Sequence, residues 1–257
     1  MRSVVQAQSR SADSDACYAD GLKRNGLLAL LSPVERSRLA VHLDLVSLSR
    51  GEVICAPGQQ LLYGFFPTSA IVSLQNTCES GETSETAVVG PEGLLGVALF
   101  MGGSAASTTA VVQTAGYAYR IHHSHLQEAF ERDWQLRRVL LRYTRALLAQ
   151  TAQLAVCNRY HTLEQQVCRW FLSTLDRVSS KQLTVTHDWV ANALGVRREG
   201  VTVTAGNLQR AGFIRYHRGQ VEVLRREGLE AHACECYAVV KRELHGLQPN
   251  VRSVQAA

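Results

Sequence analysis

Three consecutive charged residues, Arg197, Arg198 and Glu199, are the side chains in this sequence best placed to recognise a nucleic acid. They follow the turn Leu194-Gly195-Val196 and open a short stretch in which apolar residues recur at helical spacing. When a helix lies in the DNA major groove, the side chains of its N-terminal turn touch base edges. The placement of these charges therefore predicts base recognition, provided that the surrounding elements present the helix to DNA.

The elements around this triplet fit a winged helix-turn-helix. Apolar residues repeat at helical spacing over 186–194 and again over 201–210, on either side of the glycine-containing turn. Two alternating runs, 213–217 and 221–224, then flank the tight turn Arg218-Gly219, as the strands of a hairpin do. Helix, turn, helix and hairpin in this order predict that the second helix is the one that enters the groove.

The positive charge of the chain is concentrated in the same segment. Residues 181–226 hold eight lysines and arginines and three acidic residues, a net charge of +5, which equals the formal charge of all 257 residues. Clustered positive charge attracts the phosphate backbone, and binding releases counterions. A run of positive charges alone is more often a solvated surface. It is the combination of these charges with the helix pattern that favours a DNA-binding function.

Composition argues against several other classes of protein. Of the 257 residues, 46% are hydrophobic and 19% are charged, which is ordinary for a globular chain of two modest domains. The sequence has no run of 18 apolar residues and no apolar signal-peptide region, so we expect neither a membrane span nor secretion. Seven scattered cysteines favour a reduced, cytoplasmic protein over a disulfide framework. No spacing of serine, histidine or carboxylates indicates a catalytic site, so we do not expect an enzyme.

Upstream of the basic segment the pattern changes along the chain. Residues 1–26 are polar and predict a flexible N-terminal tail. Ser32-Pro33 followed by Glu35 predicts the start of a helix, with the serine as its N-cap. Short runs rich in β-branched and aromatic residues, separated by glycine turns, predict a sensory β-roll domain over 27–121. A winged helix-turn-helix domain with a C-terminal extension would occupy 161–257.

A long helix between these domains, at 122–160, is predicted to join two subunits. Residues recur there at alternating steps of three and four, the a/d pattern of a coiled coil. A helix of about thirty residues would be roughly 45 Å long, which is more than a small β-roll can cover. We therefore favour a partner helix over packing against the chain's own strands. The predicted homodimer seam consists of Leu136, Leu140, Tyr143, Leu147 and Leu154.

The order of these parts resembles the Crp-Fnr family of bacterial transcription regulators. The resemblance covers about 27–226, and its most specific stretch is 194–201, Leu-Gly-Val-Arg-Arg-Glu-Gly-Val, which is similar to the family pattern L-G-x-[ST]-R-E-x-V. It implies an α+β fold: a cyclic-nucleotide-binding-like β-roll (a double-stranded β-helix), a long dimerisation helix and a C-terminal winged helix-turn-helix. It also implies a homodimeric regulator that binds an inverted-repeat operator in double-stranded DNA and has RNA polymerase as a further partner.

The resemblance assigns roles to individual residues of the winged helix. Arg198 would donate to a guanine, and Glu199 would accept from the amino group of a cytosine, which is the chemistry expected of these side chains in the major groove. Thr186 and His217 fall where the family contacts phosphates. The complete predicted DNA-binding set is Thr186, His187, Arg197, Arg198, Glu199, Thr202, Val203, His217 and Arg218.

Several positions depart from the family pattern. Arg197 replaces the usual serine or threonine cap, which removes about 1 kcal/mol of capping but adds a cation near the phosphates. Val203 replaces a second base-reading arginine, so the operator should differ from the commonest half-site. Val97 and Ala106 stand where cyclic-nucleotide binders place a glutamate and an arginine, so we expect no familiar binding of cyclic AMP. Only Cys17 lies in the region of the cysteine cluster of iron–sulfur members, so we expect no such cofactor.

Two smaller groups of residues contain metal-ligand types. His122, His123 and His125 are too close along the chain to converge on one ion, and a polar surface turn is favoured. Cys234 and Cys236 could bind a metal, with a histidine nearby at position 232, or sense redox state, but a single Cys-x-Cys is a weak signal. An alternative function is a signalling module that binds a small molecule and acts through protein contacts. The sequence identifies no effector and does not distinguish activation from repression.

Overall fold

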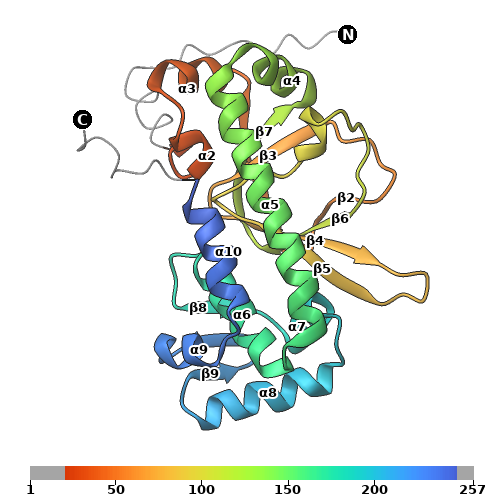
Figure 1. The fold of residues 1–257 in the computed structure, drawn as a ribbon, viewed down its shortest axis with the longest axis vertical. Coiled ribbons are helices and arrows are strands. Elements are labelled where there is room, and N and C mark those ends of the chain that lie inside the picture. The colour runs from red at the N-terminus through yellow and green to blue at the C-terminus, as the bar shows by residue number, and fades with distance from the viewer. Residues whose placement is uncertain (1–20, 248–257) are drawn as a thin grey trace, which may run out of the picture.

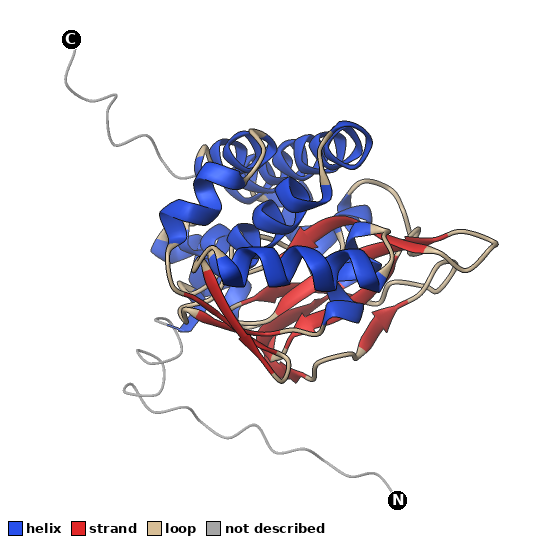
Figure 2. Cartoon of the chain, turned by 90° about the horizontal axis from the view of Figure 1, so that it is seen from below, coloured by secondary structure: helices blue, strands red, loops and turns tan. Residues whose placement is uncertain are grey.

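The computed structural model of the chain describes residues 21–247. A β-roll forms the N-terminal half, a winged helix forms the C-terminal part, and the long helix α5 (Trp134–Tyr160) runs between them along the long axis (Figure 1). Seen from below, most of the helices gather on one side of the strands (Figure 2). The predicted α+β architecture is thereby confirmed.

The β-roll consists of two small antiparallel sheets, with the strand orders β1-β7-β3 and β2-β6-β4-β5. Its strands are β1 (Leu43–Leu48), β2 (Val53–Cys55), β3 (Tyr63–Pro67), β4 (Ile71–Thr77), β5 (Thr83–Val89), β6 (Thr109–Thr114) and β7 (Gly116–His122). Phe66, Val72 and Val112 are fully buried members of one apolar cluster that draws on both sheets. Burying this apolar surface is what stabilises the roll.

Two short helices, α2 (Gly26–Ala29) and α3 (Pro33–Ala40), precede the first strand. The predicted helix start at Ser32 is confirmed, because its hydroxyl accepts a hydrogen bond from the Glu35 N–H at 3.3 Å. The Glu35 carboxylate in turn accepts from the Ser32 N–H at 3.1 Å. This reciprocal capping box satisfies two helix-end donors that would otherwise lack partners.

The segment 21–26 is part of the folded body. Leu22 is buried, and Asn25 is buried too, where its side-chain amide donates to the carbonyls of Pro67 and Gly93 at 2.9 and 2.8 Å. Asn25 also caps α2 by accepting from two backbone N–H groups. The predicted flexible tail of residues 1–26 is therefore wrong for its last six residues, and residues 1–20 lie outside the described part.

The helical region predicted as one element at 122–160 is two helices, α4 (His123–Arg132) and α5. Asp133 separates them with an extended backbone, and its carboxylate accepts hydrogen bonds from the N–H groups of Gln135 and Leu136 at 2.9 and 3.1 Å. An aspartate in this position satisfies the free donors at the start of a helix. The long helix α5 therefore begins at Trp134, later in the chain than the predicted start at residue 122.

The face of α5 predicted to form the dimer seam packs against the chain's own structure instead. Leu140 and Tyr143 are 0% and 1% exposed within a single chain, and they belong to the apolar cluster that fills the β-roll. All five predicted seam residues are buried within the single chain: Leu136, Leu140, Tyr143, Leu147 and Leu154. Side chains with almost no accessible surface cannot bind a second subunit, so the structure corrects this part of the prediction.

The opposite face of α5 carries large apolar side chains that lie in solvent. Trp134, Leu141 and Leu148 are 60%, 50% and 63% exposed, and they follow one another at intervals of seven residues. Seven residues make almost two helical turns, so the three side chains form one stripe along the helix. We call these three residues the exposed stripe.

The C-terminal part begins with α6 (Leu163–Leu175) and contains a second apolar core around Trp170 and Phe171. Its remaining elements are β8 (Gln182–Thr184), α7 (His187–Leu194), α8 (Arg198–Arg210), β9 (Ile214–His217), β10 (Gln220–Val223), α9 (Arg226–His232) and α10 (Cys236–His245). The three strands form a sheet of order β8-β10-β9. Helix α10 then runs back beside α5 (Figure 1), where Arg145 and Glu243 form an ion pair at 2.8 Å. No described helix has both the length and the apolar character of a membrane span.

A buried carboxyl group lies where the β-roll meets the winged helix. Glu85 on β5 is 4% exposed and accepts a hydrogen bond from the Ser73 hydroxyl at 2.6 Å. Burial raises the pKa of Glu85 to about 7, although Ser73 and the charges of Arg169 and Arg177 oppose this shift. Because the folded chain then holds a proton that the unfolded chain releases near pH 4.5, the group stabilises the fold most below that pH. That contribution is lost as the pH rises through 7.

We expect Glu85→Gln to remove this pH dependence. The variant should be more stable than the parent at pH 8 by about 3 kcal/mol, and the difference should shrink towards pH 5. Urea unfolding at both pH values measures this effect, with Glu79→Gln in the exposed hairpin of the same sheet as the control. Equal pH dependence of the parent and Glu85→Gln would show that folding does not raise the pKa of Glu85.

Candidate nucleic-acid interface

Local sequence sets the geometry of the two helices that form the interface. The hydroxyl of Thr186 caps α7 by accepting from the Trp189 N–H at 3.2 Å. The helix ends at Gly195, whose φ of +66° lies in the left-handed region that glycine adopts without strain. Arg197 then occupies the N-cap of α8 in an extended conformation, and its side chain makes no capping hydrogen bond. It is therefore free to reach outwards.

Helix α8 has one buried and one exposed face. Val201, Ala205 and Leu208 are buried in the core of the winged helix. The opposite face begins with the predicted base-recognising pair and continues one turn later. Its exposed side chains include those of Arg198, Glu199, Thr202 and Val203. A helix anchored on one side and open along its first two turns on the other fits the geometry of a recognition helix.

Arg198 has a replaceable partner. Its Nε lies 3.5 Å from Oδ1 of Asp188, and both side chains are more than half exposed. Exposed ion pairs contribute about 0–1 kcal/mol, because water and salt screen the charges. The contact therefore orients the guanidinium but holds it only weakly. A base edge or phosphate could replace the carboxylate at little cost in free energy.

His187 links the two helices to the wing. Its Nδ1 lies 2.9 Å from the Thr202 hydroxyl, and its ring stacks on Tyr216 with 4.3 Å between centroids. The Tyr216 hydroxyl donates to the carbonyl of Val185 at 3.1 Å. Burial lowers the pKa of His187, and the charge of Arg198 lowers it further, so both effects favour the neutral ring. His187 of α7 thus connects Thr202 of α8 to Tyr216 of the wing.

The wing is a hairpin whose turn consists of Arg218 and Gly219. Both residues have positive φ, +47° and +78°, as a two-residue turn of type I′ requires. Arg218 is the one described non-glycine residue with positive φ, and it is exposed beside His217 at the tip. The turn thus projects a cation at the end of the sheet, where a wing can meet phosphates.

The β-roll residues at the two predicted nucleotide-contact positions are small or apolar. Val97 begins a short 3-10 helix (Val97–Phe100) and packs against the apolar cluster of the roll. Ala106 is 8% exposed, and its backbone exchanges hydrogen bonds with Gln59 and Gly58 at 2.9 Å each. Neither side chain can form a charged or polar contact with a ligand.

The structure places the predicted DNA-binding residues together at one end of the molecule. Thr186 and His187 lie at the start of α7, Arg197 to Val203 on the cap and first turns of α8, and His217 and Arg218 on the wing. They are exposed except His187, which is half-buried. His122, His123 and His125, by contrast, lie at the distant junction of β7 and α4, where His125 stacks on His42 at 4.0 Å.

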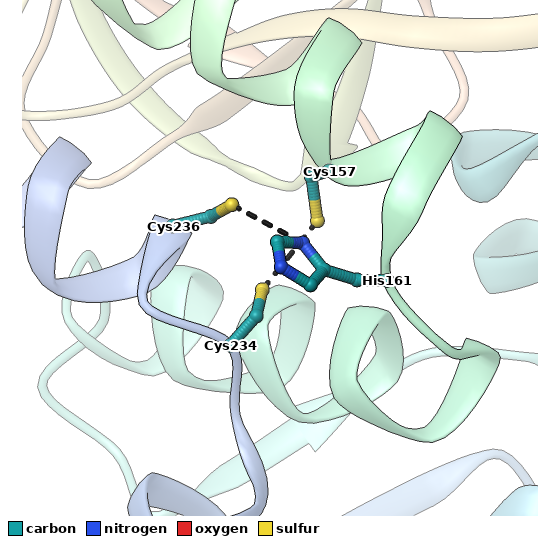
Figure 3. Close-up of side chains that lie close together, drawn as sticks. All are labelled: Cys157, His161, Cys234 and Cys236. Atoms are coloured by element: carbon teal, nitrogen blue, oxygen red, sulfur yellow. Dashed lines mark hydrogen bonds between the residues drawn. The ribbon is translucent and has the colours of Figure 1, made fainter.

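Two residues of another group are not apparent from the sequence. The sequence places His232 near Cys234 and Cys236, but the Nδ1 of His232 is 2.9 Å from the carbonyl of Gly228. The side chains that lie beside the two cysteines are Cys157 and His161, which come from the end of α5 (Figure 3). Their spacing of four residues at the end of one helix is the signal that could be combined with Cys-x-Cys.

Comparisons with known proteins agree with this architecture. The family model of the cyclic nucleotide-binding domain matches residues 45–133, and that of the Crp-like helix-turn-helix domain matches residues 165–232. Together they span more than half of the chain. A comparison with curated proteins finds no match.

Solved structures of regulators share the fold. FixK2 from Bradyrhizobium japonicum aligns with a TM-score of 0.66 and 17% identity, over 75% of this chain and 98% of its own. A putative Crp/Fnr regulator from Eubacterium rectale gives 0.64 and 15%, over 82% and 98%. The c-di-GMP-responsive regulator CLP of Xanthomonas campestris gives 0.58 and 17%, over 75% and 99%. With both of its domains matched by family models and its fold shared with these regulators, this chain belongs to the Crp-Fnr family of DNA-binding transcription regulators.

Proposed function

We propose that the protein is a homodimeric, cytoplasmic regulator that reads an inverted-repeat operator with the first turn of α8. The observation that carries this proposal is the exposed pair Arg198 and Glu199 at the start of a helix whose other face is anchored in a core. In the major groove an arginine can bind the O6 and N7 of guanine, and a glutamate can accept from the amino group of cytosine. Arg197 and Arg218 would contribute to phosphate binding, as would the Thr186 and His217 positions.

The dimer that we propose uses the exposed stripe of α5. Trp134, Leu141 and Leu148 are large apolar side chains left in solvent along a 27-residue helix. Large apolar side chains left exposed along one side of a helix are typical of a protein–protein contact, and the exposed Arg138 and Arg145 lie between them. The heptad spacing suits a second copy of the same helix, related by a two-fold axis. Two recognition helices related in this way would bind half-sites one DNA turn apart.

A selection experiment tests this function without assuming any operator sequence. The full-length protein is used to enrich a library of random DNA duplexes, in parallel with Arg198→Ala. We expect the parent to enrich an inverted repeat, because a two-fold dimer imposes its symmetry on the site. The variant should lose the preference at the contacted base pair. No enriched sequence, or the same sequence from both proteins, would argue for the alternative function in which the winged helix contacts proteins.

We further propose that DNA binding does not require cyclic AMP. A buried cyclic phosphate needs a cationic partner, and the resemblance assigns that place to Ala106 and the place of the ribose acceptor to Val97. Each missing charged hydrogen bond removes about 1.5–3 kcal/mol, or roughly ten- to a hundredfold in affinity. We therefore expect no cyclic AMP binding by calorimetry at micromolar concentrations and no change in affinity for the selected operator. A micromolar dissociation constant accompanied by activation of DNA binding would refute this.

A further inference from the structure

Four side chains with metal-binding atoms converge where the long helix meets the winged helix. Cys157 lies in the last turn of α5, and His161 is the residue that ends this helix. More than seventy residues later, Cys234 lies in the connection between α9 and α10, and Cys236 is the first residue of α10 (Figure 3). Their three sulfur atoms and one ring nitrogen all lie within 4.8 Å of one another. This group of four is called the Cys3His cluster below.

The distances within the cluster fit the ligands of a single ion. The sulfur atoms of Cys157 and Cys234 are 3.5 Å apart, and the Cys236 sulfur is 3.4 Å from Nδ1 of His161. Zinc binds thiolate sulfur at about 2.3 Å and imidazole nitrogen at about 2.0–2.1 Å, so ligand atoms at the corners of a tetrahedron are roughly 3.5–3.8 Å apart. The cluster needs only small side-chain adjustments to reach this arrangement.

We propose that the Cys3His cluster is a binding site for one Zn²⁺ ion, coordinated by the three sulfurs and by Nδ1 of His161. Three thiolates with one imidazole are a soft donor set that favours zinc over magnesium or calcium. All four corners of the tetrahedron are filled by the protein, which is the pattern of a structural zinc site. On binding, the three cysteine thiols release their protons to solvent, and the neutral imidazole supplies a lone pair.

Neighbouring groups fit the needs of such a site. Nε2 of His161 lies 3.2 Å from a carboxylate oxygen of Glu235, so the ring can donate its N–H there and keep Nδ1 free for the metal. The side-chain amide of Gln153 donates to the Cys236 sulfur at 3.1 Å. Glu235 comes from between the two cysteines of the Cys-x-Cys motif, so this short motif supplies two ligands and the partner of a third.

A buried cation balances the charge of the site. Zn²⁺ with three thiolates carries a net charge of −1, which is costly to bury without a counter-charge. Arg169 on α6 is 5% exposed, it interacts with Cys157, and its Nε has no hydrogen-bond partner among the described residues. The guanidinium therefore lies where the anionic complex needs a positive charge.

The position of the site suits a structural role, because its ligands lie at the two ends of the DNA-binding unit. The chain between His161 and Cys234 contains the helices, strands and wing of the DNA-binding unit. A metal ion that joins the two ends of this segment closes a loop around the unit and attaches it to the end of α5. Closing a long loop lowers the conformational entropy of the unfolded chain and so stabilises the fold. The ion would therefore hold the winged helix at a fixed angle to the dimer helix.

Metal analysis of the full-length protein tests the site directly. We expect one zinc per chain after purification without a histidine tag, and three additional reactive thiols after the metal is removed by a strong chelator. Cys236→Ser and His161→Ala should each lower the zinc content at least tenfold. Cys78→Ser, at an exposed position, and Cys168→Ser, at a buried position outside the cluster, should both retain it.

A second measurement uses the unmutated chain, so it does not depend on how the variants fold. Co²⁺ added to the metal-free protein should produce the visible bands of a tetrahedral site and the ultraviolet band of cobalt–sulfur bonds. Protein that contains no zinc and gives no such spectrum would overturn the proposal, as would a stable Cys157–Cys234 disulfide or bound iron in place of zinc. Neither measurement involves DNA, so its outcome is independent of the proposed regulatory function.

Discussion

Replacing Leu141 and Leu148 together by glutamate is expected to convert the protein into a monomer and to weaken operator binding by roughly a hundredfold or more. Both side chains are at least half exposed in the single chain, so the substitutions leave its core intact. In a dimer they would place four carboxylates in one apolar seam, which is costly without partners. A monomer binds one half-site and loses the gain of about 10²–10⁴ that comes from linking two binding units.

Sedimentation equilibrium and operator binding by fluorescence anisotropy measure the two effects of this double variant. The matched control is Leu45→Glu with Leu62→Glu, because these leucines are similarly exposed but lie on the β-roll. The control should stay dimeric and bind normally. If the Leu141/Leu148 variant also remains a dimer of parental affinity, the subunits meet through another surface.

Arg198→Ala is expected to weaken binding to the selected operator by about 1–3 kcal/mol, or roughly five- to 150-fold. Binding to unrelated duplexes should change much less, because the lost contacts are to a base. Arg218→Ala should behave differently, since the wing cation would contact phosphate. It should weaken binding to all duplexes alike and reduce the slope of log affinity against log salt by about one.

Anisotropy titrations on the operator, on half-site variants and over a range of salt separate these two effects. If Arg198→Ala weakens binding to all duplexes equally and retains discrimination among half-sites, then Arg198 contacts the DNA backbone. Glu199 would then be the remaining candidate for base recognition on the first turn of α8.

Local signals in the sequence predicted the winged helix well. The glycine-containing turn at Gly195 and the tight turn Arg218-Gly219 each depend on residues within a few positions of one another. The same holds for the capping box of Ser32 and Glu35. Such features are determined by local backbone chemistry, which is visible in the order of residue types.

The dimer face could not be chosen by the same reasoning. Helix α5 carries two apolar stripes, one through Leu136, Leu140 and Tyr143 and the other through Trp134 and Leu141. The first has the alternating spacing of a coiled-coil seam and the second recurs every seven residues, but periodicity does not reveal which stripe packs on the chain's own roll. That choice depends on the position of the strands, and therefore on contacts between residues distant in sequence.

The Cys3His cluster illustrates a second limit. Cys157 and His161 are four residues apart on one helix, and Cys234 and Cys236 form a short motif, but the two pairs are separated by the whole winged helix. Each half alone is a weak signal for metal. Only the return of α10 alongside α5 brings them together (Figure 1).

A reporter measurement in cells asks whether this protein recognises a specific DNA sequence in order to control transcription. The selected operator is placed across a promoter so that its occupancy blocks RNA polymerase, and parent or Arg198→Ala is produced at equal levels. We expect the parent to lower transcription several-fold, and we expect this effect to disappear with Arg198→Ala or when one half-site is scrambled. Equal transcription with the parent and the variant, from intact and scrambled operators alike, would contradict it.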